Sequence, residues 1–502
     1  MKTRLIATWL LGITLTGCQK DFLTVIPETA LSSTILFTKE ADFQQAVNGA
    51  YVPLRFIVND RAWILGEMHS DNTYYARNIL FGAVDPTENI ADFAVPKANG
   101  VTANDNVLQQ YRLDYQIIAR TNQILASIDK VEFGADSKSN LKGQALFLRA
   151  YAYFELVRYF GKVPLHLTPT TGRTDAALPL STTEEIYAQI TKDATEASKL
   201  LLNKAKQEAG RATSGAAKTL LANVYIVQKK WAEAEVLLKD VVTNDGYVLM
   251  PDYTDAFSGT SANKNNMESV FEVQFLEGAA GYNGNYIYRV VPTPITAAEL
   301  KPITGTANTQ GLSGENNNIP TPDIIAAYEP GDKRQDISIA YVTLSQSARD
   351  NKKYPYIKKF AKPHALHNNT GNNWPVYRYA EVLLFLAESL TEQGKTADAA
   401  IYLNQIRTRA GLAATKASSQ ADVRAAIYQE RRVELAFENK RWFDLVRTGR
   451  VAEVITAYGN RIKANPLDYY FPKGAVPPPN AFTNLDLTYP LPAVEAALSP
   501  HF

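Results

Sequence analysis

The 502-residue chain has little cysteine, little histidine and no excess of either charge. One Cys and five His exclude a disulfide framework and a zinc module built from cysteines. Its 52 Lys and Arg balance 51 Asp and Glu, so the net basic footprint of a duplex-binding protein is absent and we expect no nucleic-acid partner. What remains is an ordinary globular composition, 46% hydrophobic, with an excess of tyrosine at 27 residues.

Long hydrophobic runs are also scarce, and the clearest one stands at the N-terminus. Residues 5–17 form an apolar stretch after Lys2 and Arg4, too short to span a bilayer and typical of a signal peptide. It ends in LTGC (15–18), which resembles a bacterial lipobox with Cys18 as the acylated residue. We therefore predict a signal peptide over 1–17, a lipidated tether over 18–45, and membrane attachment through lipid alone.

The tripeptide that follows the lipobox bears on where the protein is displayed. Gln19, Lys20 and Asp21 resemble the short charged surface-export signal of Bacteroidetes lipoproteins. This resemblance implies an outer-membrane lipoprotein that faces the cell exterior.

Helical periodicity dominates the rest of the chain, which we expect to be a single domain over 46–502. Apolar residues recur at three- and four-residue spacing over 107–128, 141–160 and 184–202. Ser181 with Glu184 predicts a capping box at the start of the third segment.

An internal repeat indicates the kind of helical fold. Residues 217–241 align without a gap on 382–406, which pairs Ala222 with Ala387, Ala232 with Ala397, Ala234 with Ala399 and Leu238 with Leu403. Small residues at matched positions allow two antiparallel helices to approach closely, as in tetratricopeptide-like repeats. We predict a mostly α fold on such a scaffold, with loop-rich insertions at about 55–105 and 245–375 and minor β structure, including a strand at 269–275.

The two insertions are rich in aromatic and polar residues and supply the candidate ligand site. Sugars present an apolar face and a rim of hydroxyls, so their sites combine flat aromatic rings with fixed polar groups. The first candidate cluster is Trp63, Asp71, Asn72, Tyr74, Tyr75, Arg77 and Phe81, and the second is Tyr282, Asn283, Asn285, Tyr286, Tyr288 and Arg289, followed by Asn316, Asn317 and Asn318. The alternative for Tyr74, Tyr75 and Tyr286 is that they anchor the loops to the scaffold.

Catalytic signatures are missing from the sequence. There is no nucleophile elbow, phosphate-binding loop or His-Glu-x-x-His motif. Glu430, Glu434 and Glu438 recur every four residues, but like charges at this spacing repel, so we expect a structural ion-pair network with Arg378, Arg407 and Arg409 rather than an acid–base pair. His364 and His367 have no evident third ligand and are interpreted as surface histidines. We therefore predict no catalytic residue, metal or cofactor.

Several motifs, in order along the chain, resemble those of the SusD/RagB family. They are RAY (149–151), FGKVPL (160–165), RYAEVLL (378–384), LNQIRTRAG (403–411), ERRVELAFENKRWFDLVRTG (430–449) and YPLPAVE (489–495). The resemblance implies a helical fold on four tetratricopeptide-like repeats. It also implies an outer-membrane lipoprotein that captures a nutrient, usually a glycan, and forms a lid over a SusC-type TonB-dependent transporter.

The resulting hypothesis is a surface lipoprotein that binds an oligosaccharide and delivers it to its transporter. Three alternatives stay open: the same role with a peptide ligand, which RagB-like members imply, a surface glycoside hydrolase, and a purely structural lid.

Overall fold

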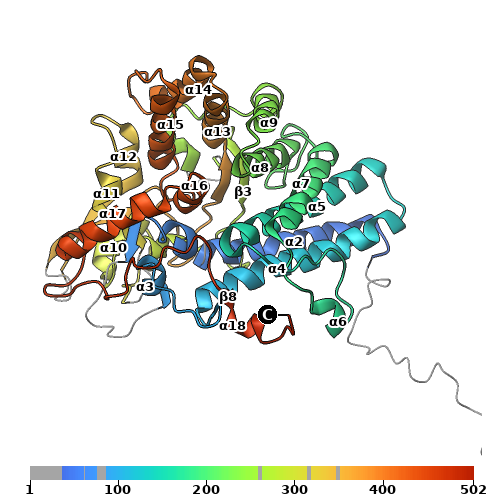
Figure 1. Ribbon diagram of the computed structural model, residues 1–502, viewed down its shortest axis with the longest axis horizontal. Helices are drawn as coiled ribbons and strands as arrows, with labels where there is room; N and C mark the ends of the chain where they lie inside the picture. The colour runs from blue at the N-terminus through green and yellow to red at the C-terminus, as the bar shows by residue number, and fades with distance from the viewer. Residues whose placement is uncertain are drawn as a thin grey trace, which may run out of the picture.

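The computed structural model describes residues 37–60, 63–75, 86–257, 263–313, 318–345 and 351–501. The predicted signal peptide, Cys18, and the first part of the predicted tether lie outside these ranges. Within them the fold is mostly α-helical, as the sequence predicts (Figure 1).

The first half of the chain forms a layer of long helices. They are α2 (Glu40–Asp60), α4 (Asp105–Ser127), α5 (Ala135–Phe160) and α7 (Thr183–Leu200), with the short α3 (Pro86–Ala91) and α6 (Arg173–Ala176) between them. α2 packs on α4, α4 on α5 and α5 on α7, so sequential helices lie side by side (Figure 1). α2 starts before residue 46 and continues to Asp60. It therefore includes residues predicted to belong to the tether (18–45) and to the first insertion (about 55–105).

The predicted capping box lies one residue further along than expected. The side chain of Thr182 accepts a hydrogen bond from Glu185 N (3.2 Å), and the Glu185 carboxylate accepts one from Thr182 N (2.8 Å). Ser181 instead donates its backbone N–H to the Val163 carbonyl at 3.1 Å, which keeps it in the extended segment before α7. The prediction of Ser181 and Glu184 as the box was therefore wrong by one position.

The internal repeat forms two helical hairpins whose bounds match throughout. The helices are α8 (Ser214–Val227), α9 (Trp231–Asn244), α13 (Tyr379–Glu392) and α14 (Thr396–Arg409), so each bound of the first hairpin recurs 165 residues later. α9 packs against α13, which joins the hairpins into one stack. Ala222, Ala387, Ala234 and Ala399 are fully buried, whereas Ala232 and Ala397 are exposed and take no part in the close approach.

The C-terminal part of the chain packs on these hairpins. It comprises α15 (Gln420–Glu434), α16 (Arg441–Arg447), α17 (Val451–Ala464), the 3-10 turn η7 (Pro466–Tyr469), β8 (Leu491–Pro492) and α18 (Ala493–Ala496). α15 packs on α13 and α14. The last strand, β8, pairs in parallel with β2 (Val101–Thr102), so the end of the chain returns to the N-terminal layer.

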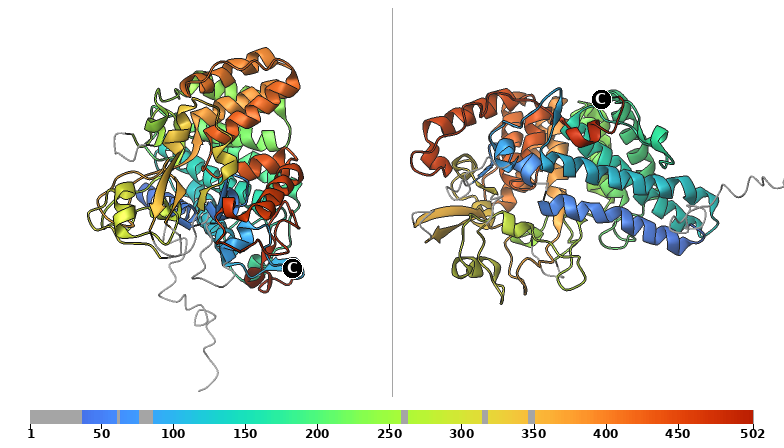
Figure 2. Two further views of the ribbon diagram at one scale, coloured as in Figure 1. Left: turned by 90° about the vertical axis from the view of Figure 1, so that its left-hand side faces the viewer. Right: turned by 90° about the horizontal axis from the view of Figure 1, so that it is seen from below.

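The two insertions hold short elements rather than bare loops. The first contains the π-helical turn η2 (Trp63–Glu67), β1 (Thr73–Tyr75), α3 and β2; the second contains η4 (Tyr253–Phe257), β3 (Ser269–Val273), η5 (Tyr286–Arg289), α10 (Ala297–Thr304), β4 (Asn318–Pro320), α11 (Pro322–Ile325), α12 (Lys333–Ser338), β5 (Ile339–Leu344), β6 (Lys352–Ile357) and, at its end, β7 (Trp374–Arg378). The predicted strand at 269–275 is confirmed as β3, which pairs with β7. Much of the second insertion lies on one side of the molecule (Figure 2).

Candidate functional site

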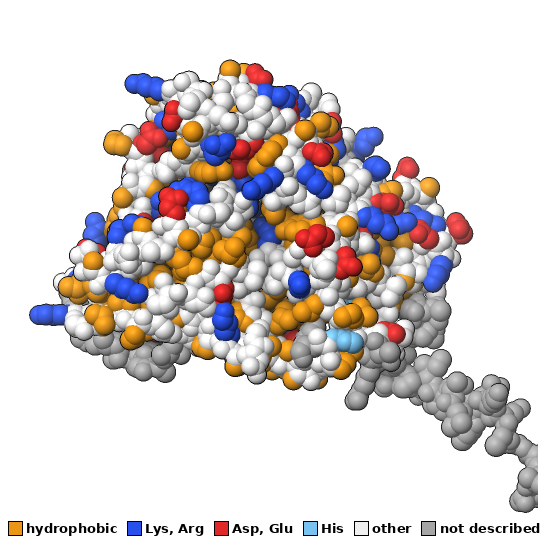
Figure 3. Space-filling view, in the orientation of Figure 1, with side chains coloured by type: hydrophobic (Ala, Val, Ile, Leu, Met, Phe, Trp, Pro, Cys, Tyr) orange, Lys and Arg blue, Asp and Glu red, His pale blue; other side chains and the backbone are white. Residues whose placement is uncertain are grey.

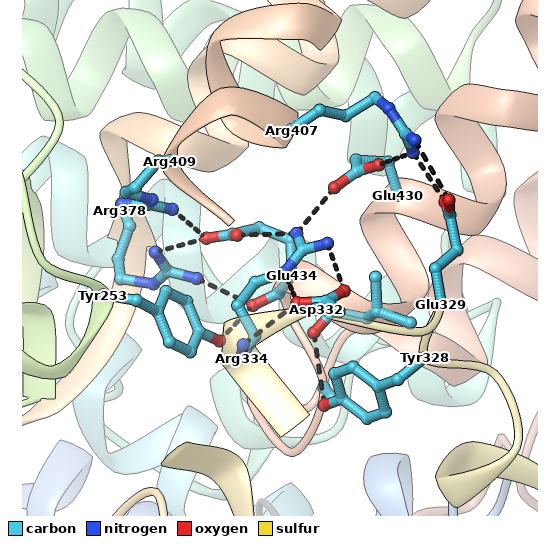
Figure 4. Close-up of polar contacts among 12 residues, drawn as sticks. Tyr253, Tyr328, Glu329, Asp332, Arg334, Arg378, Arg407, Arg409, Glu430 and Glu434 are labelled. Atoms are coloured by element: carbon cyan, nitrogen blue, oxygen red, sulfur yellow. Dashed lines mark hydrogen bonds and ion pairs between the residues drawn. The ribbon is translucent and has the colours of Figure 1, made fainter. Parts of the chain in front are cut away.

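The three regularly spaced glutamates form a buried ion-pair network, of which Figure 4 shows Glu430 and Glu434 with their partners. Glu434 contacts Arg409 at 2.5 Å and Arg378 at 3.0 Å. Arg334 joins it to Glu430, at 3.1 Å from Glu434 and 2.6 Å from Glu430. The predicted structural network is therefore present, and it includes Arg334, which was not among the predicted cations.

This network extends past the end of α15. The helix stops at Glu434, so Glu438 lies in the following turn rather than on the helical face that the four-residue spacing predicted. Glu438 pairs with Lys359 at 2.6 Å and with Arg378 at 2.7 Å. Arg407 completes the set by pairing with Glu430 at 3.0 Å.

The charges and pKa shifts in this network indicate a structural role for its carboxylates. Burial alone would raise the pKa of Glu434, but Arg409, Arg378 and Arg334 lower it well below its ordinary value. Burial also lowers the pKa of Lys359 to about 8. Because these carboxylates are at most 2% exposed and are held by cations, they have neither the access nor the freedom of an acid–base pair that acts on a glycosidic bond.

The first predicted ligand cluster is largely taken up by contacts inside the protein. Asp71 pairs with Arg441 at 2.7 Å and with Arg432 at 2.8 Å, and despite its burial these cations lower its pKa to about 2. Asn72 accepts a hydrogen bond from Arg432 Nε at 2.9 Å. These two side chains attach the segment before β1 to the C-terminal part of the chain.

The two tyrosines of this cluster are buried in β1. Tyr74 packs against Phe471 and Tyr458, and its hydroxyl donates to Asp92. Tyr75 lies opposite Asn318 in the β1–β4 ladder, which brings parts of both predicted clusters together. Trp63 belongs to η2 by its backbone. The remaining members, Arg77 and Phe81, and two of the asparagines, Asn316 and Asn317, lie outside the described residues.

Most of the second cluster also anchors its loop. Tyr286 is buried against Trp374 and Phe360, and its hydroxyl lies 3.2 Å from the Asn372 and Asn373 carbonyl oxygens. Tyr288 contacts His364, the Tyr288 hydroxyl lying 2.6 Å from Nε2. His364 is therefore not the surface residue that was predicted.

The remaining polar members of this cluster tie the loop to its neighbours. Asn283 donates to the Asn368 carbonyl at 2.8 Å, and Asn285 N–H donates to Asn59 Oδ1 at 3.1 Å. Arg289 closes the 3-10 turn η5. Tyr74, Tyr75, Tyr286 and Tyr288 thus all have packing roles, and a role of any of them in ligand binding stays a prediction.

Tyr282 differs from the other tyrosines of the two clusters because its side chain is 48% exposed. Its carbonyl accepts a hydrogen bond from Leu276 N at 2.9 Å, which holds the turn. Arg55 lies over its ring, 4.8 Å from the centroid.

Arg55 connects this ring to a cavity of about 250 Å³. The cavity lies between α2, the 208–211 turn and the end of β3, and Asn48, Tyr51, Glu208, Arg211 and Gln274 are among its lining residues. Sequence reasoning missed Arg55 and Asn48 because residues 40–60 carry no aromatic-rich loop signal; their spacing of seven, two turns of α2, was the available clue.

Cofactor and membrane features are not found in the part of the chain that the structure describes. No group of three or more His, Cys, Asp or Glu residues there could hold a metal ion. Among the described helices, none is both long and apolar enough to cross a bilayer.

Two family models match consecutive parts of the chain. The model described as "Starch-binding associating with outer membrane" matches residues 21–226, and the SusD family model matches residues 329–499, so together they match more than half of the chain. The protein therefore belongs to the SusD/RagB family.

Similar proteins extend over nearly the whole chain. SusD-like protein P2 of Formosa agariphila is 25% identical, covering 99% of this chain and 97% of its own. Among solved structures, a laminarin-binding SusD-like protein is 23% identical with a TM-score of 0.71, covering 92% of this chain and 98% of its own. Surface glycan-binding protein A of Bacteroides thetaiotaomicron is 19% identical with a TM-score of 0.68, covering 92% and 95%. These structural likenesses establish a shared fold.

Proposed function

We propose that this protein is a surface lipoprotein that binds an oligosaccharide and passes it to a TonB-dependent outer-membrane transporter. Family membership and the names of the laminarin-binding and glycan-binding neighbours support the ligand class. The lipobox supports attachment of the mature chain to the outer membrane through Cys18.

The observation that carries the proposal is the exposed ring of Tyr282 beside the cavity that Arg55 lines. A sugar packs its C–H face on such a ring, while amide and guanidinium groups donate hydrogen bonds to its hydroxyls. Asn48 and Arg55 supply such groups around the cavity. The site is open and solvated, so we expect modest affinity.

Calorimetric titration of the mature protein with oligosaccharide and peptide panels tests this proposal. We expect heat from a glycan, and Tyr282→Ala should weaken that binding about tenfold or more, in line with the loss of an aromatic contact in a binding site. Tyr341→Ala is the matched control, because Tyr341 is 45% exposed and has Lys353 over its ring at 4.8 Å. Heat from peptides alone would contradict the glycan assignment, and equal effects of both variants would contradict a binding site at Tyr282.

The anchoring part of the proposal has a separate test. Cys18→Ser should release the protein from the membrane fraction, because a chain without its acyl groups has lost the predicted attachment. Co-purification of the wild-type protein with a TonB-dependent transporter would support the delivery role, and loss of uptake of the bound glycan on deletion would distinguish delivery from simple retention. Unchanged uptake in the Tyr282→Ala strain would favour the purely structural lid.

The proposed role is capture without bond cleavage. Incubation with whichever glycan binds, followed by a reducing-end assay, should give no turnover above a heat-inactivated control. Turnover abolished by one carboxylate substitution that leaves the fold intact would establish the hydrolase alternative.

A further inference from the structure

A second cleft lies in the helical scaffold, formed by residues outside both predicted ligand clusters. It encloses about 260 Å³ at the junction of α5, α7, α8, α13 and α16. Its walls are mainly apolar and include Val157, Tyr187, Val227, Phe385 and Phe443. The face of the molecule drawn in Figure 3 has a hollow near its centre, with basic side chains inside the hollow and hydrophobic side chains around it.

Arg158 has an unusually fixed position in this cleft. Its guanidinium lies between two aromatic rings, 4.0 Å from the centroid of Phe154 and 3.9 Å from that of Phe443. One edge is used inside the protein, since Nη2 pairs with Glu155 and Nε donates to the Phe154 carbonyl at 3.2 Å. Such stacking holds the planar group before any ligand arrives.

The other edge of Arg158 has donor capacity left. Nη1 makes no hydrogen bond within the described part of the chain, and the side chain is 13% exposed at a position that lines the cleft. A fixed guanidinium edge with free N–H groups is suited to a carboxylate, which it binds with planar geometry.

The two carboxylates that line the cleft are already neutralised. Glu381 lies 2.9 Å from Lys440 and 3.2 Å from Arg431. Asp444 lies 3.0 Å from Arg431 and 2.7 Å from Arg447. Repulsion of an incoming anion by these carboxylates is therefore offset by their own cations.

The size and the walls of the cleft limit the ligand further. Its volume lies just below the range of about 300–1,000 Å³ that ordinary ligand pockets have. The apolar walls offer little to the hydroxyl rim of a sugar, whereas Phe385, Phe443 and Tyr187 match a ring or a branched chain.

We propose that this cleft binds a small aromatic carboxylate, with the carboxylate on the free edge of Arg158 and the apolar body against Phe443, Phe385 and Val227. The site is separate from the glycan site beside Tyr282 and does not depend on the proposed function. Occupancy would tie α5 to α16 and so stabilise the scaffold.

Titration of the mature chain carrying Cys18→Ser, which leaves no acyl chain or detergent to compete for the cleft, tests this proposal. The probe is phenylacetate, with phenylacetamide as its uncharged counterpart. We expect saturable binding of phenylacetate by calorimetry, with the amide about tenfold weaker or more, because a hydrogen bond to a charged partner contributes that much.

Two variants make the test specific. Arg158→Lys keeps the charge but loses the planar edge and should weaken phenylacetate about tenfold. Should that variant be unstable because Glu155 loses its partner, Val227→Phe fills the cleft and should abolish binding with Arg158 intact. Ala188→Phe, on the exposed face of α7, is the control for added bulk. Absence of saturable binding, equal binding of acid and amide, or binding unchanged by Val227→Phe would overturn the proposal.

Discussion

At the scale of single residues, burial decides which charged groups belong to the scaffold. In the sequence, the spacing of Glu430, Glu434 and Glu438 resembles an array of acid and base groups, and Asp71 and Asn72 resemble ligand-binding groups. The structure gives these side chains partners inside the protein, because an unpaired buried charge is costly and a paired one fixes the segments it joins. His69 is a further buried ionisable group, 6% exposed, whose charge state depends on its surroundings.

Removal of one charge from the network around Glu434 should lower the stability of the protein. Glu434→Gln removes the one carboxylate charge that pairs with all three of Arg334, Arg378 and Arg409, and we expect the free energy of unfolding to fall by about 3–5 kcal/mol in a urea titration. Glu453→Gln is the matched control: its pair with Arg450 spans 3.4 Å and is exposed, so the loss should stay below about 1 kcal/mol. Equal losses for the two variants would contradict a buried structural network.

His69 should make stability depend on pH. It stacks on Phe93 at 3.9 Å and its Nδ1 donates to the Ile90 carbonyl at 2.7 Å, and burial lowers its pKa to about 4. Because the folded pKa is below the unfolded value, this contribution is complete above about pH 6.5 and is lost as pH falls toward 4. We expect about 2 kcal/mol of destabilisation between pH 7 and pH 5 from this group.

The comparison that isolates this effect is with His69→Phe. Whatever the variant costs at pH 7, its stability should fall less than that of the wild type when both are measured by denaturant titration at pH 7 and pH 5. A parallel fall in both proteins would show that other groups are responsible.

At the scale of elements, local sequence signals locate helices well but caps less well. Ser181 with Glu184 and Thr182 with Glu185 both have the spacing of a capping box. The hydrogen bond from Ser181 N to the Val163 carbonyl keeps Ser181 outside the helix and selects the second pair. Thr182→Ala should therefore cost about 1 kcal/mol of stability, as the loss of an N-cap does. Ser181→Ala should cost much less, and the reverse order of the two variants in thermal unfolding would restore the original prediction.

The repeat hairpins allow a similar test of packing. Ala387 is fully buried in α13, so Ala387→Leu should overpack the hairpin stack and cost about 1–3 kcal/mol. Ala397→Leu on α14 is the control, because Ala397 is exposed and the change should stay within about 0.5 kcal/mol. A denaturant titration of both variants decides whether buried alanines set the approach of these helices.

At the scale of the whole molecule, contacts between distant parts of the chain join the two halves. Asp71 binds Arg432 and Arg441, and Glu67 accepts hydrogen bonds from the backbone of Phe437 and Asn439. Gly66 leaves room for the Asn439 side chain at this junction, because a Cβ there would lie 1.6 Å from Asn439 Oδ1 and would displace it. Chains of this length often divide into separate domains, but these contacts favour one cooperative unit.

Equilibrium unfolding should therefore show a single transition. Far-ultraviolet circular dichroism reports on all helices, and tryptophan fluorescence reports on the environments of all the tryptophans, among which Trp374 in β7 and Trp442 in α16 are buried. The two signals should coincide in a urea titration. Separate midpoints would indicate that the N-terminal helices and the C-terminal part fold independently.

The helical scaffold, the paired hairpins, β3 and the family could be predicted from the amino-acid sequence, because they rest on periodicity and on motifs within short segments. Even Arg378, Arg407 and Arg409 could be assigned as partners, since the glutamate spacing demanded tertiary cations. The packing of the whole chain sets which insertion side chains are buried and which are exposed to solvent, since Tyr286 and Tyr282 stand in one loop and look alike in sequence. It also brought Arg55 to Tyr282 and Arg334 to Glu434, because such contacts depend on how distant segments pack and leave no local signal.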